Sequence, residues 1–204
     1  AGSLSIFNFA NNLQSFPIGI FAIPFALAVF PILSPHAARD ERGIFLENFS
    51  KTFRQILFFI IPASILILVL RAQIVRIVLG AGNFDWQDTI LTFQALGIFA
   101  VSLFAQSTIP LLARSFYALH NTRVPFLTGI ISEVFNLAAA LILSRYWGVL
   151  GLVWALSLSS IVNMFLLVFI LRHKLENLDD KKIVFVIFKI SVSALAAGLV
   201  AQLA

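Results

Sequence analysis

Two long apolar runs separated by a short polar turn constrain the fold of this chain more than any other feature. Residues 89–113 contain no charged side chain, and residues 124–144 contain only one, Glu133. Each run exceeds the ~20 apolar residues that a helix needs to cross a ~30 Å hydrocarbon core. The turn between them carries Arg114, His120 and Arg123. We therefore expect this turn at a membrane surface, where two spanning helices reverse direction.

The composition places the whole chain in the membrane class. Hydrophobic residues make up 60% of its 204 residues and charged residues only 11%, whereas a soluble domain carries ~25% charged residues. The net charge is +5, but the basic residues lie in short segments between apolar runs. This distribution is typical of cytoplasmic loops, so we expect no nucleic-acid partner. The chain starts inside an apolar stretch without Met, and we interpret it as part of a longer polytopic protein.

The apolar pattern repeats along the chain and predicts an all-α polytopic membrane protein with about six transmembrane helices. The expected spans are residues 16–33, 56–70, 89–113, 124–144, 147–171 and 183–204. Prolines 17, 24 and 31, spaced by seven residues, should bend the first helix. An amphipathic helix on the cytoplasmic surface is expected near 41–54, because Phe45, Phe49 and Phe53 recur every four residues.

The polar segments between the spans predict the orientation. Residues 71–88 are expected as a loop with a turn at 80–85, where Asp85 and Asp88 suit a helix N-cap. Ten basic residues fall on one side of the expected helices, and three fall on the other, Arg71, Arg76 and Arg145. This excess predicts that the first side is cytoplasmic.

Five short segments, in order, resemble the motifs of one family. They are Leu33-Ser34 with His36-Ala37-Ala38, then Gly82-Asn83-Phe84-Asp85 with Asp88-Thr89 and Gln94-Ala95-Leu96, then Phe116-Tyr117-Ala118 with Thr122-Arg123 and Pro125, then Asn136-Leu137-Ala138, and finally Gly148 with Gly151-Leu152. With these motifs the chain resembles the MurJ/MviN family, the proposed lipid II flippases, over most of residues 2–173.

The resemblance implies an architecture and a function. The fold would be the second lobe of a MATE-like transporter of the multidrug/oligosaccharidyl-lipid/polysaccharide (MOP) superfamily. Residues 1–173 would form a partial C-terminal transport lobe, and 174–204 a loop and an additional transmembrane helix. The protein would flip lipid II, the undecaprenyl-pyrophosphate-linked peptidoglycan precursor, across the bacterial cytoplasmic (inner) membrane by alternating access. Its implied partners are lipid II, bilayer lipids and an N-terminal lobe outside this chain.

Polar residues at the outer end of the first helix are candidates for lining a central cavity. They are Asn8, Asn11, Asn12 and Gln14, and a simple interfacial location is the alternative. Asn12 stands where the family usually has an arginine, and asparagine lacks the charge that would favour a pyrophosphate. Gln94, Gln106, Ser107 and Thr108 could line the same cavity, but hydrogen bonds between helices are the favoured interpretation.

Glu133 is the least expected residue of the spans, because a carboxyl group near the bilayer midplane costs free energy. Such a residue is a candidate for a functional role. It is a candidate for lining the cavity and, with Asn136 three residues later, for coupling transport to a cation, Na⁺ or H⁺. A neutral carboxyl group or pairing with Lys189 are the alternatives. The acidic residue that the family places one turn after Asn136 is Ala140 here.

No pattern indicates chemistry on a covalent bond. His36, His120 and His173 lie far apart in expected loops, and no metal motif or nucleophile–base pattern is present. We therefore expect a transporter with no metal and no cofactor beyond a coupling cation. Two other functions stay open: an exporter of another lipid-linked oligosaccharide or small molecule, and a membrane scaffold that no longer transports.

Overall fold

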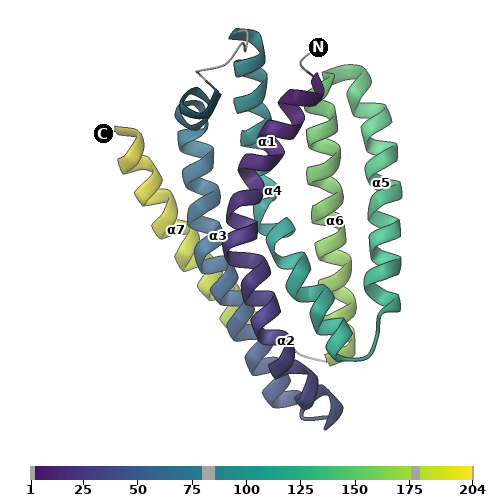
Figure 1. The fold of residues 1–204 in the computed structure, drawn as a ribbon. Coiled ribbons are helices and arrows are strands. Elements are labelled where there is room, and N and C mark those ends of the chain that lie inside the picture. The colour runs from purple at the N-terminus through teal and green to yellow at the C-terminus, as the bar shows by residue number, and fades with distance from the viewer. Residues whose placement is uncertain (1–2, 80–85, 176–179, 204) are drawn as a thin grey trace.

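The protein is a bundle of long helices (Figure 1). The computed structural model describes residues 3–79, 86–175 and 180–203. The elements in chain order are α1 (Ser3–Pro17), the π-helical segment η1 (Ile18–Ala22), α2 (Ile23–Ala38), α3 (Arg42–Leu79), α4 (Trp86–Ala118), α5 (Arg123–Trp147), α6 (Val149–Leu175) and α7 (Asp180–Leu203).

Five stretches of the described chain are helical, long and apolar enough to cross a membrane. They are Leu4–Ala38, Arg42–Val78, Asp88–Ala118, Arg123–Trp147 and Val149–Leu175. A shorter apolar stretch, Phe185–Gly198, lies within α7 in the place of the expected sixth span. The prediction of an all-α polytopic membrane protein is therefore confirmed.

The first span is a single helical rod with a wide turn in its middle. The π-helical segment η1 follows Pro17 directly, and its last hydrogen bond runs from the amide of Ile23 to the carbonyl of Ile18. The ring of Pro24 would collide with the carbonyl four residues earlier in a regular α-helix, and a wider turn relieves that collision. Arg114 of α4 donates a hydrogen bond of 3.3 Å to the carbonyl of Ile23, the residue that directly follows η1.

Residues 41–54 do not form a separate helix on the membrane surface. Residues 42–54 belong to α3, which runs unbroken from Arg42 to Leu79. Phe45, Phe49 and Phe53 are buried in the main hydrophobic core, because the apolar side of this segment packs against the protein instead of the bilayer. The expected loop at 71–88 is also partly helical: residues 71–79 continue α3, and α4 begins at Trp86.

Asp88 lies within the first turn of α4 instead of capping it, and there its charge is favourable at the positive end of the helix dipole. Asp85 and the expected turn at 80–85 lie outside the described residues.

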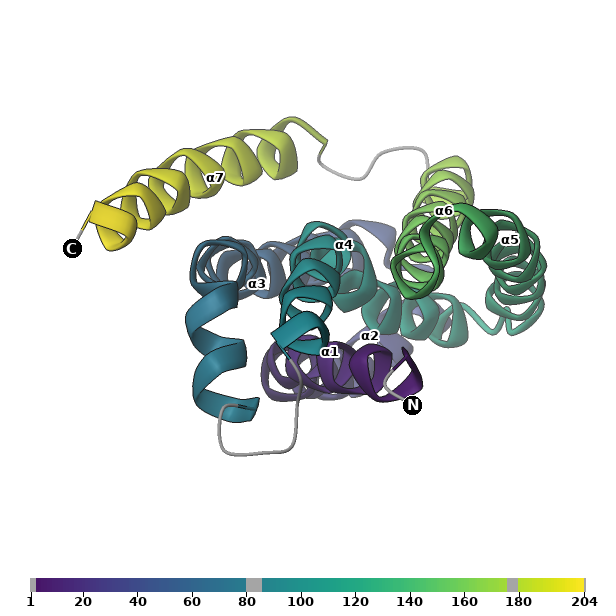
Figure 2. The same cartoon turned by 90° about the horizontal axis from the view of Figure 1, so that it is seen from above.

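The helix α4 occupies the centre of the bundle and packs against α1, α2, α3 and α6. Figures 1 and 2 show α5 and α7 on opposite sides of it. The main contacts of α5 are with α6, and those of α7 are with α3. One large face of α5 is therefore left uncovered, with exposed side chains such as Phe126, Val134 and Leu137.

Glycine is required where α5 turns into α6. Gly148 has a φ of 54°, a conformation that favours glycine. A Cβ atom on Gly151 would collide with the backbone carbonyl of Leu143, so the two helices approach closely there. This close approach joins the end of α5 to the beginning of α6.

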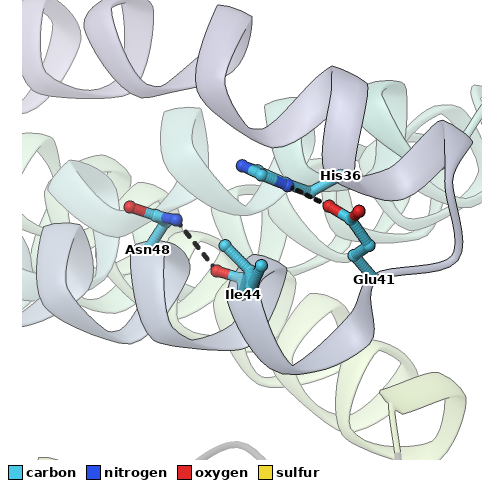
Figure 3. Close-up of polar contacts among 4 residues, drawn as sticks. All are labelled: His36, Glu41, Ile44 and Asn48. Atoms are coloured by element: carbon cyan, nitrogen blue, oxygen red, sulfur yellow. Dashed lines mark hydrogen bonds and ion pairs between the residues drawn. The ribbon is translucent and has the colours of Figure 1, made fainter.

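Polar contacts hold the turn between α2 and α3 (Figure 3). Nδ1 of His36 lies 2.6 Å from Oε2 of Glu41. The chain reverses through Asp40, whose φ is 55°. In the first turns of α3, the amide of Asn48 donates to the carbonyl of Ile44 over 2.9 Å, so Asn48 bonds within its own helix. The turn between α4 and α5 is built similarly, with His120 at a φ of 54° and Asn121 accepting a hydrogen bond from the amide of Val124.

Candidate functional site

A groove of about 630 Å³ runs between α1 and α3; we call it the α1–α3 groove. Its walls include Phe9, Asn12 and Phe16 on α1, and Ile67, Ile74 and Val78 on α3. Among the described residues that line the groove, Asn12 is the only polar one. The groove therefore offers an apolar surface with a single uncharged hydrogen-bonding side chain.

The other three candidate residues of α1, Asn8, Asn11 and Gln14, do not line this groove. Asn8 is exposed and Asn11 is half-buried. Gln14 has no exposed surface, because it lies between α1 and α4. The four residues are thus neighbours on one helix, and only Asn12 faces the α1–α3 groove.

Gln14 belongs to a chain of hydrogen bonds that crosses three helices. Its amide exchanges two bonds with Gln106 of α4, of 3.1 and 3.2 Å. Gln106 also donates to Ser102 over 2.9 Å, and Ser102 donates to Ser157 of α6 over 3.0 Å. The interpretation of Gln106 as an inter-helix contact is confirmed, and Gln14 is its partner. This chain ties α1, α4 and α6 together at one depth.

Glu133 and Asn136 meet on the exposed side of α5. The amide of Asn136 donates to Oε2 of Glu133 over 3.4 Å, and Glu133 is exposed. The alternative pairing with Lys189 is wrong, because Lys189 lines a separate groove between α3 and α7, across the bundle from α5 (Figure 2). The order of the expected spans along the chain does not show which helices become neighbours, so it could not predict that Glu133 and Lys189 lie apart.

Asn163 of α6 is a polar residue that the sequence analysis missed. Its Oδ1 is buried and accepts no hydrogen bond from the part of the chain that the structure describes. The signal for it was an amide side chain in the middle of an expected transmembrane span, residues 147–171.

The residues of the expected turn motif divide into a buried and an exposed set. Phe116 is fully buried in the main core, whereas Tyr117, Thr122, Arg123 and Pro125 line a shallow surface hollow. Phe116 therefore anchors the end of α4, and the others lie at the expected membrane surface. In residues 3–79, 86–175 and 180–203, no three His, Cys, Asp or Glu side chains gather as a metal site.

Comparison with known proteins identifies the family. The family described as "Lipid II flippase MurJ" matches residues 1–204, the whole chain. The chain belongs to the MurJ family. Among its relatives, a probable lipid II flippase MurJ of Bdellovibrio bacteriovorus is 30% identical over 171 residues, covering 84% of this chain and 33% of the relative. A probable lipid II flippase MurJ of Thermotoga maritima is 29% identical over 199 residues, covering 98% of this chain and 39% of the relative.

A solved MurJ structure supports the fold independently. The lipid II flippase MurJ in an inward closed conformation superimposes with a TM-score of 0.84 at 26% identity, covering all of this chain and 41% of that protein. The chain thus spans between a third and about two fifths of the length of the MurJ proteins it matches. The MurJ/MviN resemblance and the MATE-like transporter fold predicted from sequence are confirmed, and the chain is a multi-pass membrane protein.

Proposed function

We propose that the full-length protein is a lipid II flippase of the bacterial cytoplasmic membrane. The observation that carries this proposal is the match of the whole chain to the MurJ family, supported by a TM-score of 0.84 to a MurJ structure. The substrate would be the undecaprenyl-pyrophosphate-linked peptidoglycan precursor. The protein would move this lipid between leaflets without breaking a covalent bond, so it acts as a transporter.

The bundle would act as one of two parts that rock against each other. The chain of hydrogen bonds from Gln14 to Ser157 holds α1, α4 and α6 as one body, which suits rigid-body motion. The wide turn η1 lets the first rod change direction in its middle. An N-terminal lobe outside this chain would complete the cavity, and the head group would travel between the two lobes. Asn8, Asn11 and Asn12 remain predicted cavity residues.

Glu133 and Asn136 are proposed as the coupling site for Na⁺ or H⁺. Their side chains are 3.4 Å apart on the membrane-spanning helix α5. A carboxylate and amide oxygens suit a hard cation, and a carboxyl group inside a membrane also suits proton transfer.

A second candidate is an exporter of a different lipid-linked oligosaccharide. It is favoured by Asn12, which has no charge to offer a pyrophosphate. A scaffold that has lost transport would fit the same observation.

Complementation tests the proposal. The full-length gene is expressed in a bacterium depleted of its own lipid II flippase, and the appearance of lipid II in the outer leaflet is measured alongside growth. We expect rescue of both. A protein that inserts properly into the cytoplasmic membrane and rescues neither is not a lipid II flippase, and transport of another lipid-linked sugar would then identify the exporter.

A further inference from the structure

A small hollow lies where three segments of the bundle end at the same face. It measures about 140 Å³ and is bordered by the turn between α2 and α3, the turn between α4 and α5, and the last turn of α6. These segments meet at the end of the bundle where α2 turns into α3 (Figure 1), which the distribution of basic residues predicts to be cytoplasmic. We call it the turn hollow. It shares no lining residue with the α1–α3 groove.

Core residues form the floor of the turn hollow. Phe45 and Leu175 are only 1% and 6% exposed, and both belong to the main hydrophobic core. Leu119 also lines the hollow and packs against the same core. Because the floor is part of the core, the polar side chains around it are held on a fixed base.

The rim of the turn hollow is basic. Among the described residues that line it, four side chains can carry a positive charge and one carries a negative charge. The positive ones are His36, Arg42, His120 and Lys174, and the negative one is Asp40. Arg42 donates to Oδ1 of Asp40 over 3.0 Å. The one carboxylate on this rim is therefore already paired with a cation.

Two of the basic side chains have unused hydrogen-bonding capacity. In the part of the chain that the structure describes, the side chains of His120 and Lys174 make no hydrogen bond or ion pair. They come from different segments, the α4–α5 turn and the end of α6. His36 is held by Glu41 at 2.6 Å, and its second ring nitrogen points away from that contact (Figure 3). The rim thus offers donors from three segments to one ligand.

The ends of α2 and α4 do not oppose an anion here. The C-terminal end of a helix is negative because its last carbonyl groups lack partners. In the α2–α3 turn, the amide of Glu41 donates to the carbonyl of His36 over 2.9 Å. In the α4–α5 turn, the amide of Asn121 donates to the carbonyl of Phe116, also over 2.9 Å. These bonds satisfy carbonyl groups that would otherwise repel a negative ligand.

We propose that the turn hollow binds a single phosphate group. Lysine and histidine side chains bind phosphate through charge-assisted hydrogen bonds, and Lys174 and His120 hold it from two segments of the bundle. The volume of about 140 Å³ suits one such group, since pockets for drug-sized ligands measure about 300–1,000 Å³. The bound phosphate links the end of α6 to the α4–α5 turn. Its source is either soluble phosphate or the head group of an anionic phospholipid.

Calorimetric titration of the purified full-length protein with inorganic phosphate is the first test. We expect saturable binding that Lys174→Gln weakens about fivefold, the loss expected for a solvent-exposed ion pair. Lys51→Gln is the matched control, because Lys51 is an exposed lysine of α3 that does not line the hollow. This control should bind like the wild type. Equal affinities of Lys174→Gln and the wild type would overturn the proposal.

Asp40→Asn should change the affinity in the opposite direction. It removes the carboxylate from the rim, so phosphate should bind about two- to fivefold more tightly. Asparagine tolerates the φ of 55° at this position, so the turn should be preserved. Weaker binding by this variant would contradict an anion site. His120→Asn, at a φ of 54°, should weaken binding, and it decides the question if Lys174→Gln does not accumulate as folded protein.

A second arm distinguishes the two sources of phosphate. The full-length protein is placed in phosphatidylcholine nanodiscs with and without phosphatidylglycerol, and the retained phosphatidylglycerol is counted by native mass spectrometry. Retention that falls in Lys174→Gln but not in Lys51→Gln assigns the site to a lipid head group. Equal retention, with binding of inorganic phosphate that depends on Lys174, assigns it to soluble phosphate. A folded wild type that shows neither kind of binding overturns the site and leaves the proposed transport of lipid II untouched.

Discussion

Replacing Gln14 and Gln106 by leucine, singly and together, should measure how firmly α1 is held to the bundle. The two amides exchange hydrogen bonds of 3.1 and 3.2 Å in a site where Gln14 has no exposed surface. Hydrogen bonds between membrane helices contribute about 0.6 kcal/mol on average and up to about 1.7 kcal/mol. Two such bonds should therefore contribute about 1–3 kcal/mol to the free energy of unfolding.

The interaction energy comes from a double-mutant cycle. Each single change removes both bonds and leaves the other amide with an oxygen that lacks its donor, so both single variants should be clearly destabilised. The double variant removes both amides and should be less destabilised than the two single effects combined. The free energy of unfolding is measured by titrating the purified full-length protein with SDS in mixed micelles.

Ser15→Ala is the matched control. Ser15 is the neighbour of Gln14 and is exposed, and its hydroxyl donates to the carbonyl of Asn11 in the same helix over 2.7 Å. Its loss should change the free energy of unfolding by less than about 0.5 kcal/mol. An interaction energy between Gln14 and Gln106 below about 0.3 kcal/mol, the scatter expected of independent sites, would refute the conclusion that this pair holds α1 in place.

Three other changes test separate parts of the structure. Phe49→Ala should lower the free energy of unfolding by about 3–5 kcal/mol, because Phe49 is buried in the core; an effect below about 1 kcal/mol would favour a surface helix. Gly151→Ala should destabilise the full-length protein by at least about 1–3 kcal/mol, because its methyl group meets the backbone of Leu143, which cannot yield; Gly129→Ala should be tolerated, and equal stabilities of the two variants would contradict the close helix approach. Glu133→Ala should reduce the cation dependence of lipid II flipping and the rescue of a depleted strain, whereas rescue equal to the wild type would remove Glu133 from the coupling site.

The helices and their turns were predictable because burial in lipid demands long apolar runs, whatever the tertiary structure. The turns near His120 and Gly148 follow directly from where those runs stop. The first half of α3 was not predictable in this way. A helix with Phe45, Phe49 and Phe53 on one side looks the same in sequence whether that side meets lipid or other helices, and only tertiary packing decides.

The candidate site also combines contacts that the sequence predicts with contacts that depend on tertiary packing. The contact between Glu133 and Asn136 follows from their spacing of three residues on one helix. The separation of Glu133 from Lys189 depends on which helices become neighbours, and the sequence of spans does not encode that order. Arg71 was assigned to a loop because charge usually marks the end of a span. A Cβ atom on Gly97 of α4 would collide with Nη1 of Arg71, so this contact joins two helices and becomes visible only in the folded protein.

The wide turn at Ile18–Ala22 also determines the direction in which the outer half of the first rod faces. Successive residues of an α-helix are rotated by about 100°, and a π-helical turn absorbs one residue more than an α-helical one. If the same sequence wound as an uninterrupted α-helix, Gln14 would swing about 100° away from Gln106, and Asn12 would rotate out of its groove with it. These five residues thus set the rotation of Ser3–Pro17 about the helix axis, and the bonds between Gln14 and Gln106 form only at that rotation.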